Sequence, residues 1–146
     1  MQALPNKAYI ALGAALFIAY HGGKNTPIAG TAIAEHYGLK KRALEPTLQC
    51  LGSKGILDSI RGQGGGYYMP APENVSVADV VSCFLDDKNP CEKAFTEFSP
   101  VMMNALKPGL HQWLQSMSRI SIKDLCDQLD DSGVAKMGEA VLDFAI

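Results

Sequence analysis

Cysteines are few in this chain, and they do not form a pattern that would hold it together. Only four occur among 146 residues, far apart and without a Cys-x-x-Cys pair: Cys50, Cys83, Cys91 and Cys126. This spacing argues against a dense disulfide framework and against a zinc ribbon. Reduced thiols in a cytoplasmic protein fit it best.

Long apolar runs are also absent. No segment reaches the ~18 to 20 apolar residues that span a bilayer, so we expect no membrane association. The longest stretch, residues 8–20, follows Lys7, and the small residues Ala32-Ile33-Ala34 come later, which has the outline of a signal peptide with its cleavage site. A single basic residue before the stretch and a long polar gap after it favour a buried first helix. A secreted protein is the alternative.

No arrangement of residues typical of an enzyme is visible. The three histidines, His21, His36 and His111, are scattered and have no acidic partner at a metal-binding or acid–base spacing. The glycine-rich run 62–66 is not followed by Lys-Ser/Thr or by a predicted helix, which argues against a phosphate-binding loop. We therefore expect a protein that is not an enzyme.

The net charge of −2 conceals an asymmetry. Residues 1–70 carry seven basic and three acidic side chains, a net charge of +4, whereas residues 71–146 carry six basic and twelve acidic ones, a net charge of −6. A basic half joined to an acidic half can bind a polyanion with one face and keep the other away from it.

Apolar periodicity predicts a mainly α-helical chain with one hairpin. With 47% hydrophobic residues, the chain has the composition of one globular protein. Helices are predicted at 7–20, at 28–37 with Gly38 as the closing left-handed residue, and at 40–53, where Pro46 should bend or delay the first turns. Residues 56–60 and 67–69 read as two strands.

After the Pro70-Ala71-Pro72 boundary the pattern is helical again. Ser76 is a predicted cap for a helix that ends near Asp86-Asp87, and an apolar stripe from Phe95 to Ile120 predicts a long helix, kinked or split at Pro108-Gly109. Residues 121–125 look like a capping box that opens a last short helix. The resulting division is residues 1–72, residues 73–130 and an unassigned tail (131–146).

The second and third predicted helices have the spacing of a helix-turn-helix. Ala34 is a small residue for the helix crossing, Gly38 serves the tight turn, and Leu44 lies under the second helix. A plain packed helix pair is the alternative. Lys40, Lys41 and Arg42 follow the turn, at the end of the helix that enters a major groove and carries the positive dipole.

The glycine-rich loop suits the tip of a wing. Glycines let a backbone approach DNA closely, and Arg61 could reach into a narrow minor groove. A flexible exposed hairpin is the alternative reading.

These features occur in an order that resembles the Rrf-two (Rrf2) family of bacterial winged-helix regulators, which includes the IscR, NsrR, RirA and CymR types. The resemblance covers residues 5 to about 88 closely and residues 120–125 more loosely. It rests on the segments KAYIAL (7–12), LE (44–45), GIL (55–57), RGQGGGY (61–67) and VSVADVV (75–81). It implies a winged helix-turn-helix fold and a homodimer, built through a long C-terminal helix, that reads a palindrome. Residues 1–72 would then be the DNA-binding head and residues 73–130 the dimerisation helices.

The chain departs from the pattern of the family members that bind clusters. Those members carry three closely spaced cysteines before the dimerisation helix and in some cases a ligand just before the N-terminal tyrosine, whereas here only Cys91 lies in that region and Ala8 precedes Tyr9. An iron–sulfur cluster needs about four ligands, so we expect no cofactor. Cys50, Cys83 and Cys126 read as small core residues, which leaves Cys91 as the candidate sensor thiol.

The sequence thus predicts a cytoplasmic, sequence-specific transcription regulator, most simply a repressor, that binds double-stranded DNA as a homodimer. Its effector would be an oxidant acting on Cys91 or a small molecule bound between the head and the long helix. The predicted DNA contacts are Lys41, Arg42 and Arg61, supported by Lys40, Gln63 and Tyr67, while Glu45 would accept a hydrogen bond from a cytosine amino group or orient Arg42. The alternative is a winged-helix module that binds another protein.

Overall fold

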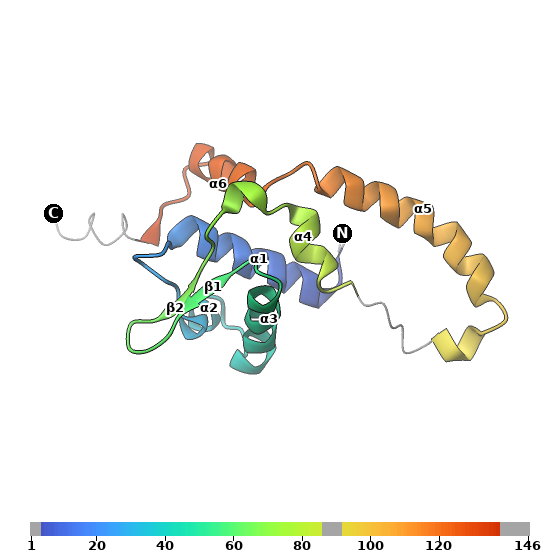
Figure 1. Cartoon of the computed structure of the whole chain (residues 1–146), viewed down its shortest axis with the longest axis horizontal. Helices are drawn as coiled ribbons and strands as arrows, with labels where there is room; N and C mark the ends of the chain where they lie inside the picture. Colours follow the sequence, from blue (N-terminus) through green and yellow to red (C-terminus); the bar gives the residue numbers. More distant parts are fainter. Residues whose placement is uncertain (1–3, 86–91, 138–146) are drawn as a thin grey trace.

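A computed structural model describes residues 4–85 and 92–137 of the chain. These residues form six α-helices and one two-stranded antiparallel sheet, which confirms the predicted, mainly helical winged helix-turn-helix (Figure 1). The elements are α1 (Asn6–His21), α2 (Gly30–Tyr37), α3 (Lys41–Ser53), β1 (Asp58–Ile60), β2 (Gly66–Tyr68), α4 (Val77–Ser82), α5 (Ser99–Met117) and α6 (Ile122–Asp131), with 3-10 turns at Pro72–Asn74 and Glu92–Phe95.

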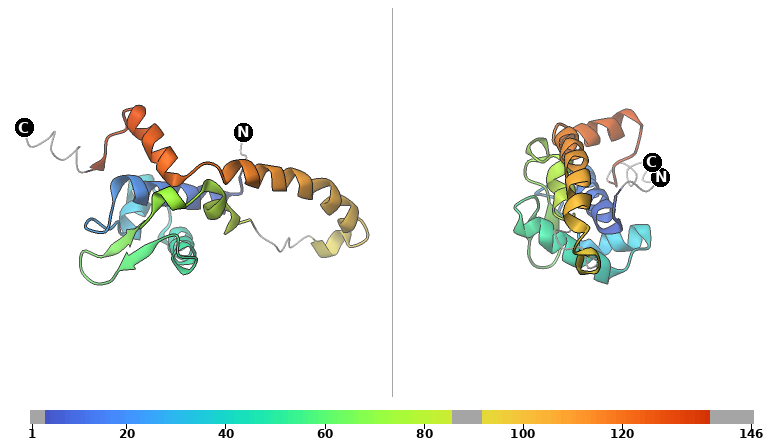
Figure 2. Two further views of the ribbon diagram at one scale, coloured as in Figure 1. Left: turned by 45° about the horizontal axis from the view of Figure 1, so that its top comes forward. Right: turned by 90° about the vertical axis from the view of Figure 1, so that its right-hand side faces the viewer.

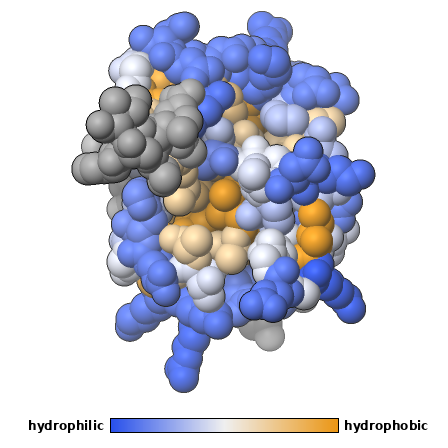
Figure 3. All heavy atoms as spheres, turned by 90° about the vertical axis from the view of Figure 1, so that its left-hand side faces the viewer, coloured by the Kyte–Doolittle hydropathy of each residue, from blue (hydrophilic) through white to orange (hydrophobic). Residues whose placement is uncertain are grey.

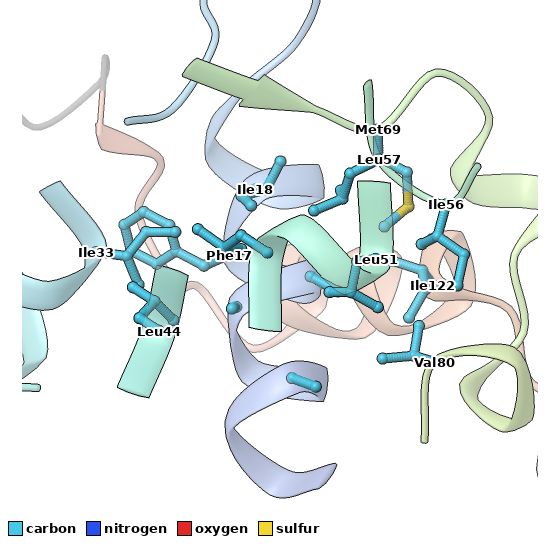
Figure 4. Packing of buried hydrophobic residues seen from close by; sticks show 14 of the residues in the cluster. Phe17, Ile18, Ile33, Leu44, Leu51, Ile56, Leu57, Met69, Val80 and Ile122 are labelled. Atoms are coloured by element: carbon cyan, nitrogen blue, oxygen red, sulfur yellow. The ribbon is translucent and has the colours of Figure 1, made fainter. Parts of the chain in front are cut away.

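Helix α1 is the centre of the molecule. It packs against α3, α4 and α6, and it is buried on several faces because small and large apolar residues alternate along it. Figure 4 shows Phe17 and Ile18 of α1 meeting Leu51 of α3 and Ile122 of α6 in one continuous core. Residues 8–20, which have the outline of a signal peptide, thus lie in a core helix, as the prediction of a buried first helix states.

Serine residues cap the starts of both α4 and α6. Ser76 and Ser121 each accept a hydrogen bond from the backbone of the residue three positions later, and the carboxylates of Asp79 and Asp124 bond back to the cap amides. The backbone segments before the two helices also pair with each other at Ser76 and Ser121. Both predicted caps are confirmed, and the backbone bridge joins the starts of two helices that each pack on α1.

Helix α5 extends away from the rest of the molecule, as Figure 1 and the left view of Figure 2 show. It is one continuous, gently curved helix, so the predicted split at Pro108-Gly109 is wrong. Proline removes one backbone donor, which leaves the carbonyl of Asn104 without its partner. Asn104 and Pro108 are both exposed, so water can satisfy that carbonyl and the helix continues.

Several other details differ from the sequence prediction. Ile28 is not helical: its N–H and C=O both bond to the backbone of Tyr67 at 2.8 Å, so α2 begins only at Gly30. The first strand has three residues rather than the five predicted, and the second keeps its predicted length but begins one residue earlier, at Gly66. Helix α4 ends at Ser82, so its predicted end near Asp86-Asp87 is wrong. Pro46 lies inside α3 on its exposed face without delaying the start of the helix at Lys41, for the same reason as at Pro108.

No helix in the described ranges 4–85 and 92–137 is both long enough and apolar enough to cross a membrane.

Candidate nucleic-acid interface

The turn between α2 and α3 has the geometry that its sequence predicts. Gly38 adopts φ 64°, the left-handed conformation that favours glycine, and its N–H and that of Leu39 both bond to the carbonyl of Ala34. Ala34 and Leu44 are buried at the crossing of the two helices, 6% and 1% exposed. This bonding fixes the angle at which α3 leaves the turn and presents its first residues to solvent.

The first turns of α3 carry four of the predicted DNA-contacting side chains. Lys40, Lys41, Arg42 and Glu45 are all exposed. In the described part of the chain the ion pairs are Lys123–Asp127 and Lys136–Asp130, so the three basic groups have no acidic partner there. The structure brings them together as a basic end of α3 that is free to meet an anion.

The N-termini of α2 and α3 differ from those of α4 and α6. Ala29 and Lys40 occupy the cap positions of α2 and α3, neither provides a side-chain cap, and neither helix has an acidic residue in its first turn. Helix α1 shares this lack of a cap, but α4 and α6 carry complete capping boxes. The first backbone amides of a helix that lacks a cap can donate to phosphate oxygens, and the dipole favours negative charge there.

The wing is the β1–β2 hairpin, with Asp58 opposite Tyr68 and Ile60 opposite Gly66. Gly62 and Gly64 adopt φ 99° and 77°, as the run of glycines predicts. Gly65 and Gly66 have a different role, because neither position has room for a side chain. A Cβ at Gly65 would lie 2.1 Å from the Ile60 carbonyl oxygen, and a Cβ at Gly66 would lie 2.4 Å from the Ile28 carbonyl carbon. The close approach at Gly65 keeps the hairpin loop tight, and the close approach at Gly66 packs the second strand against the segment before α2.

The wing side chains divide into exposed and packed ones. Arg61 and Gln63 are exposed at the tip. Tyr67 is half-buried against the core, and its backbone is bonded to Ile28, so its position suits support of the wing. Figure 3 faces this end of the molecule and shows hydrophilic side chains around a small central apolar area.

Asp58 and Tyr68 form a cross-strand pair that was not singled out from the sequence. The Tyr68 hydroxyl donates to the Asp58 carboxylate at 3.1 Å, and this bond raises the pKa of Tyr68 above 10.0. Their places on two strands joined by a short glycine-rich loop were the available signal, because a hairpin brings such residues opposite each other. The pairing of Ile28 with Tyr67 had none, because the two residues are remote in sequence.

Helix α5 exposes large apolar side chains along its length. Val101 is 73% exposed, Leu106 65% and Phe98 57%, with further exposed positions at Met102, Met103 and Leu110. Only the end of α5 near Trp113, Leu114 and Met117 packs on the core. An apolar face of this size on a single chain is typical of an interaction surface.

The described thiols do not form a cluster site. Cys50, Cys83 and Cys126 are half-buried free thiols on three different helices or helix ends, and burial is the main cause that raises the pKa of Cys83 and of Cys126. Among the described residues no three His, Cys, Asp or Glu side chains gather as metal ligands. Cys91, the predicted sensor, lies outside the described residues. This donor set does not fit an iron–sulfur cluster, which needs several thiolates close together.

Comparison with protein families gives one match that covers most of the chain. The profile of a family described as "Rrf2: Iron-dependent Transcriptional regulator" matches residues 4–128. A curated relative, the HTH-type transcriptional regulator NsrR of Bacillus subtilis (strain 168), is 31% identical over 107 residues, which are 68% of this chain and 73% of the relative.

Solved structures show the same fold at lower sequence identity. The chain is similar to the structure described as T. potens IscR, with a TM-score of 0.69 and 20% identity over 94% of this chain and 95% of the other. It is also similar to CymR (YrzC), the global cysteine regulator of B. subtilis, with a TM-score of 0.61 and 20% identity over 88% and 98% of the two chains. The related proteins are transcriptional regulators rather than enzymes.

Proposed function

The chain belongs to the Rrf2 family of DNA-binding transcriptional regulators, and on that premise we propose that it is a homodimeric, cytoplasmic repressor that binds a palindromic operator. The observation that carries the proposal is the start of α3. Three adjacent basic side chains without ion pairs stand there on a helix end without a cap, next to a glycine-rich wing with an exposed arginine.

In this proposal α3 is the recognition helix. Its N-terminal end enters the major groove, where Lys41 and Arg42 donate to guanine or phosphate oxygens and Lys40 contacts the backbone. Glu45 lies one turn further and accepts from a cytosine amino group or orients Arg42. The uncapped amides of α2 and α3 add contacts to phosphates, which set the register of the head on the duplex.

The wing supplies the second contact. Arg61 and Gln63 stand at its tip, where Gly62 and Gly64 keep the backbone thin enough to enter a minor groove. A narrow minor groove concentrates negative potential and attracts an arginine. Tyr67 holds the wing against Ile28 and adds a contact of its own only from the edge of its half-buried ring.

Dimerisation through α5 brings together the two heads that bind the palindrome. The exposed apolar face of α5 is covered by the same face of a second copy, as an isologous two-fold interface requires. The two heads then lie about 34 Å apart, one turn of DNA, which corresponds to a palindrome with two half-sites.

The effector acts on a thiol or in the groove between head and long helix. The thiols described above do not suit an iron–sulfur cluster, so we propose that the protein carries none. Oxidation or modification of Cys91 is then the simplest signal, because the thiol precedes α5 in the sequence and could alter how the two copies pair.

A gel-shift titration with genomic fragments tests this function. Wild type should select a small subset of fragments, and a variant with Lys41→Ala and Arg42→Ala should bind them more weakly by about 1 to 3 kcal/mol per lost contact. The slope of log affinity against log salt should also fall by about 0.9 for each lost phosphate contact. Equal, weak binding to all fragments by both proteins would instead favour a module that binds another protein.

A further inference from the structure

The end of α1 opposite the start of the chain carries a group of contacts that DNA binding does not use. After α6, residues 132–137, called the strap here, fold back onto the last turn of α1. The N–H of Met137 donates to Nδ1 of His21 at 3.1 Å. The Tyr20 hydroxyl bonds to the carbonyl of Val134, and the Lys136 ammonium lies 5.3 Å from the centre of the Tyr20 ring.

The hydrogen bond from Met137 requires a neutral His21. An imidazole nitrogen accepts only when it carries no proton, so the proton of the neutral ring is on Nε2. Protonation of Nδ1 turns this acceptor into a donor that faces the N–H of Met137. The bond is then replaced by repulsion between two donors.

The surroundings of His21 also oppose its protonation. Burial, then His36 of α2 and then Lys136 of the strap lower the pKa of His21 below 6.5. On the side of α6, Asp130 is the acidic group, 3.9 Å from the Lys136 ammonium and 3.1 Å from the Tyr20 hydroxyl. A second positive charge at His21 would therefore meet Lys136 directly, while Asp130 is already engaged with Tyr20 and Lys136.

We propose that residues 132–137 are a pH-sensitive strap, which protonation of His21 releases from the end of α1. The site adjoins the helix-turn-helix, because the Phe17 ring lies 4.4 Å from the His21 ring and 5.6 Å from the rings of His36 and Tyr37 on α2. The inference depends on the fold alone and holds whether or not the protein binds an operator.

The direction of the pH effect follows from the two states of His21. With the strap docked the pKa of His21 is lowered, and with the strap released it returns towards the ordinary 6.5. Docking is therefore complete above 6.5 and weakens as the pH falls below it, until the lowered pKa of the docked state is reached. One pH unit below the ordinary value, the docking constant falls by up to about tenfold.

Amide hydrogen exchange of Met137, followed by NMR in the full chain, tests the proposal. Exchange is expressed as protection relative to an unstructured chain at the same pH, so the pH dependence of the chemistry cancels. Wild type should lose protection, up to about tenfold, between about pH 7.5 and about pH 5.5. His21→Asn should keep its protection at both pH values, because its amide oxygen lies one bond beyond Cγ, as Nδ1 does, and can accept the same hydrogen bond without titrating.

Two further variants keep the test decisive. His111→Asn is the matched control on exposed α5 and should retain the wild-type loss. His36→Gln removes a group of α2 that opposes protonation of His21 whether the strap is docked or released, so the loss should begin at a higher pH than in wild type. Equal protection of wild-type Met137 at both pH values, or the same loss in His21→Asn as in wild type, would overturn the proposal.

Discussion

At the scale of single residues, Arg61 is the side chain on which the wing's DNA contact depends. It is exposed near the tip of the hairpin and is the basic side chain of a loop, residues 61–65, whose other members are glycines and Gln63. Arg61→Ala should weaken operator binding by about 1 to 3 kcal/mol, which is about 5- to 150-fold. Lys107→Ala removes the same charge from exposed α5 and should change the affinity less than about twofold in the same filter-binding assay. Equal losses in both variants would show that the reading head is placed wrongly.

Gly65 is the wing residue at which an added side chain should disturb the hairpin most. A Cβ there would lie 2.1 Å from the carbonyl oxygen of Ile60, so Gly65→Ala must displace the backbone of the hairpin. We expect a loss of about 1 to 3 kcal/mol in the free energy of unfolding, measured in urea, together with weaker DNA binding.

Gly13→Ala is the matched control for Gly65→Ala. Gly13 lies inside α1 on an exposed face with nothing within 4 Å of the added atom. Alanine in a helix interior is more stable than glycine by about 0.5 to 1 kcal/mol, so this variant should be stabilised. A stabilising effect of Gly65→Ala would contradict the packed wing described above.

The residues of the helix-turn-helix could be predicted from the sequence, whereas the partner of Tyr67 could not. The roles of Ala34, Gly38 and Leu44 follow from local spacing, since a tight turn between two helices admits few solutions. The position of Tyr67 does not follow from such spacing, because its backbone partner Ile28 is remote in sequence. A strand with an apolar and a polar face predicts that a tyrosine is half-buried, but not which segment it pairs with.

At the scale of elements, α4 and α6 begin with complete capping boxes, whereas α2 and α3, the helices proposed to face DNA, begin without a side-chain cap, as α1 and α5 also do. Ser76 and Ser121 were predictable as caps because serine and a later acid at the third position form a known box. The sequence prediction does not include the missing caps at α2 and α3, because it begins these helices two residues and one residue too early. Placing the start of α2 correctly requires the tertiary pairing of Ile28 with Tyr67.

Helix α5 is the element whose role is easiest to test separately. Leu106 and Leu110 are exposed at spacing four on its apolar face, 65% and 47%. A double variant with Leu106→Glu and Leu110→Glu should sediment as a monomer of 15.6 kDa at micromolar concentration, because glutamates cannot be buried in an isologous apolar interface. Gln112→Glu, exposed on the same helix, should leave the wild-type dimer intact. Wild type that sediments only as a monomer would contradict the proposed assembly.

At the scale of the whole molecule, the thiols decide how a signal reaches the DNA-binding head. Burial raises the pKa of Cys83 and Cys126, so both stay protonated thiols near neutral pH and are poor cluster ligands. Anaerobically purified protein should therefore contain far less than one iron and one sulfide per chain and should be colourless. Near-stoichiometric iron and sulfide with a visible absorption band that Cys91→Ala abolishes would show that the ligands were misjudged.

Cys91 is the thiol proposed to sense the oxidant. In colourless protein, peroxide should change DNA binding only when Cys91 is present, so Cys91→Ala should respond no more than an untreated sample. Cys126→Ala is the matched control and should respond like wild type, because its half-buried thiol is protonated.

The central claim is that two winged heads, held by α5, read a two-fold symmetric sequence. Repeated selection of random DNA duplexes by the purified full chain, followed by sequencing, tests it most directly. We predict an inverted repeat whose half-sites have centres about one helical turn, or about 10 base pairs, apart, and weak enrichment of it by the variant with Lys41→Ala and Arg42→Ala. Recovery of no common sequence, or of the same sequence with equal enrichment by that variant, would contradict the account.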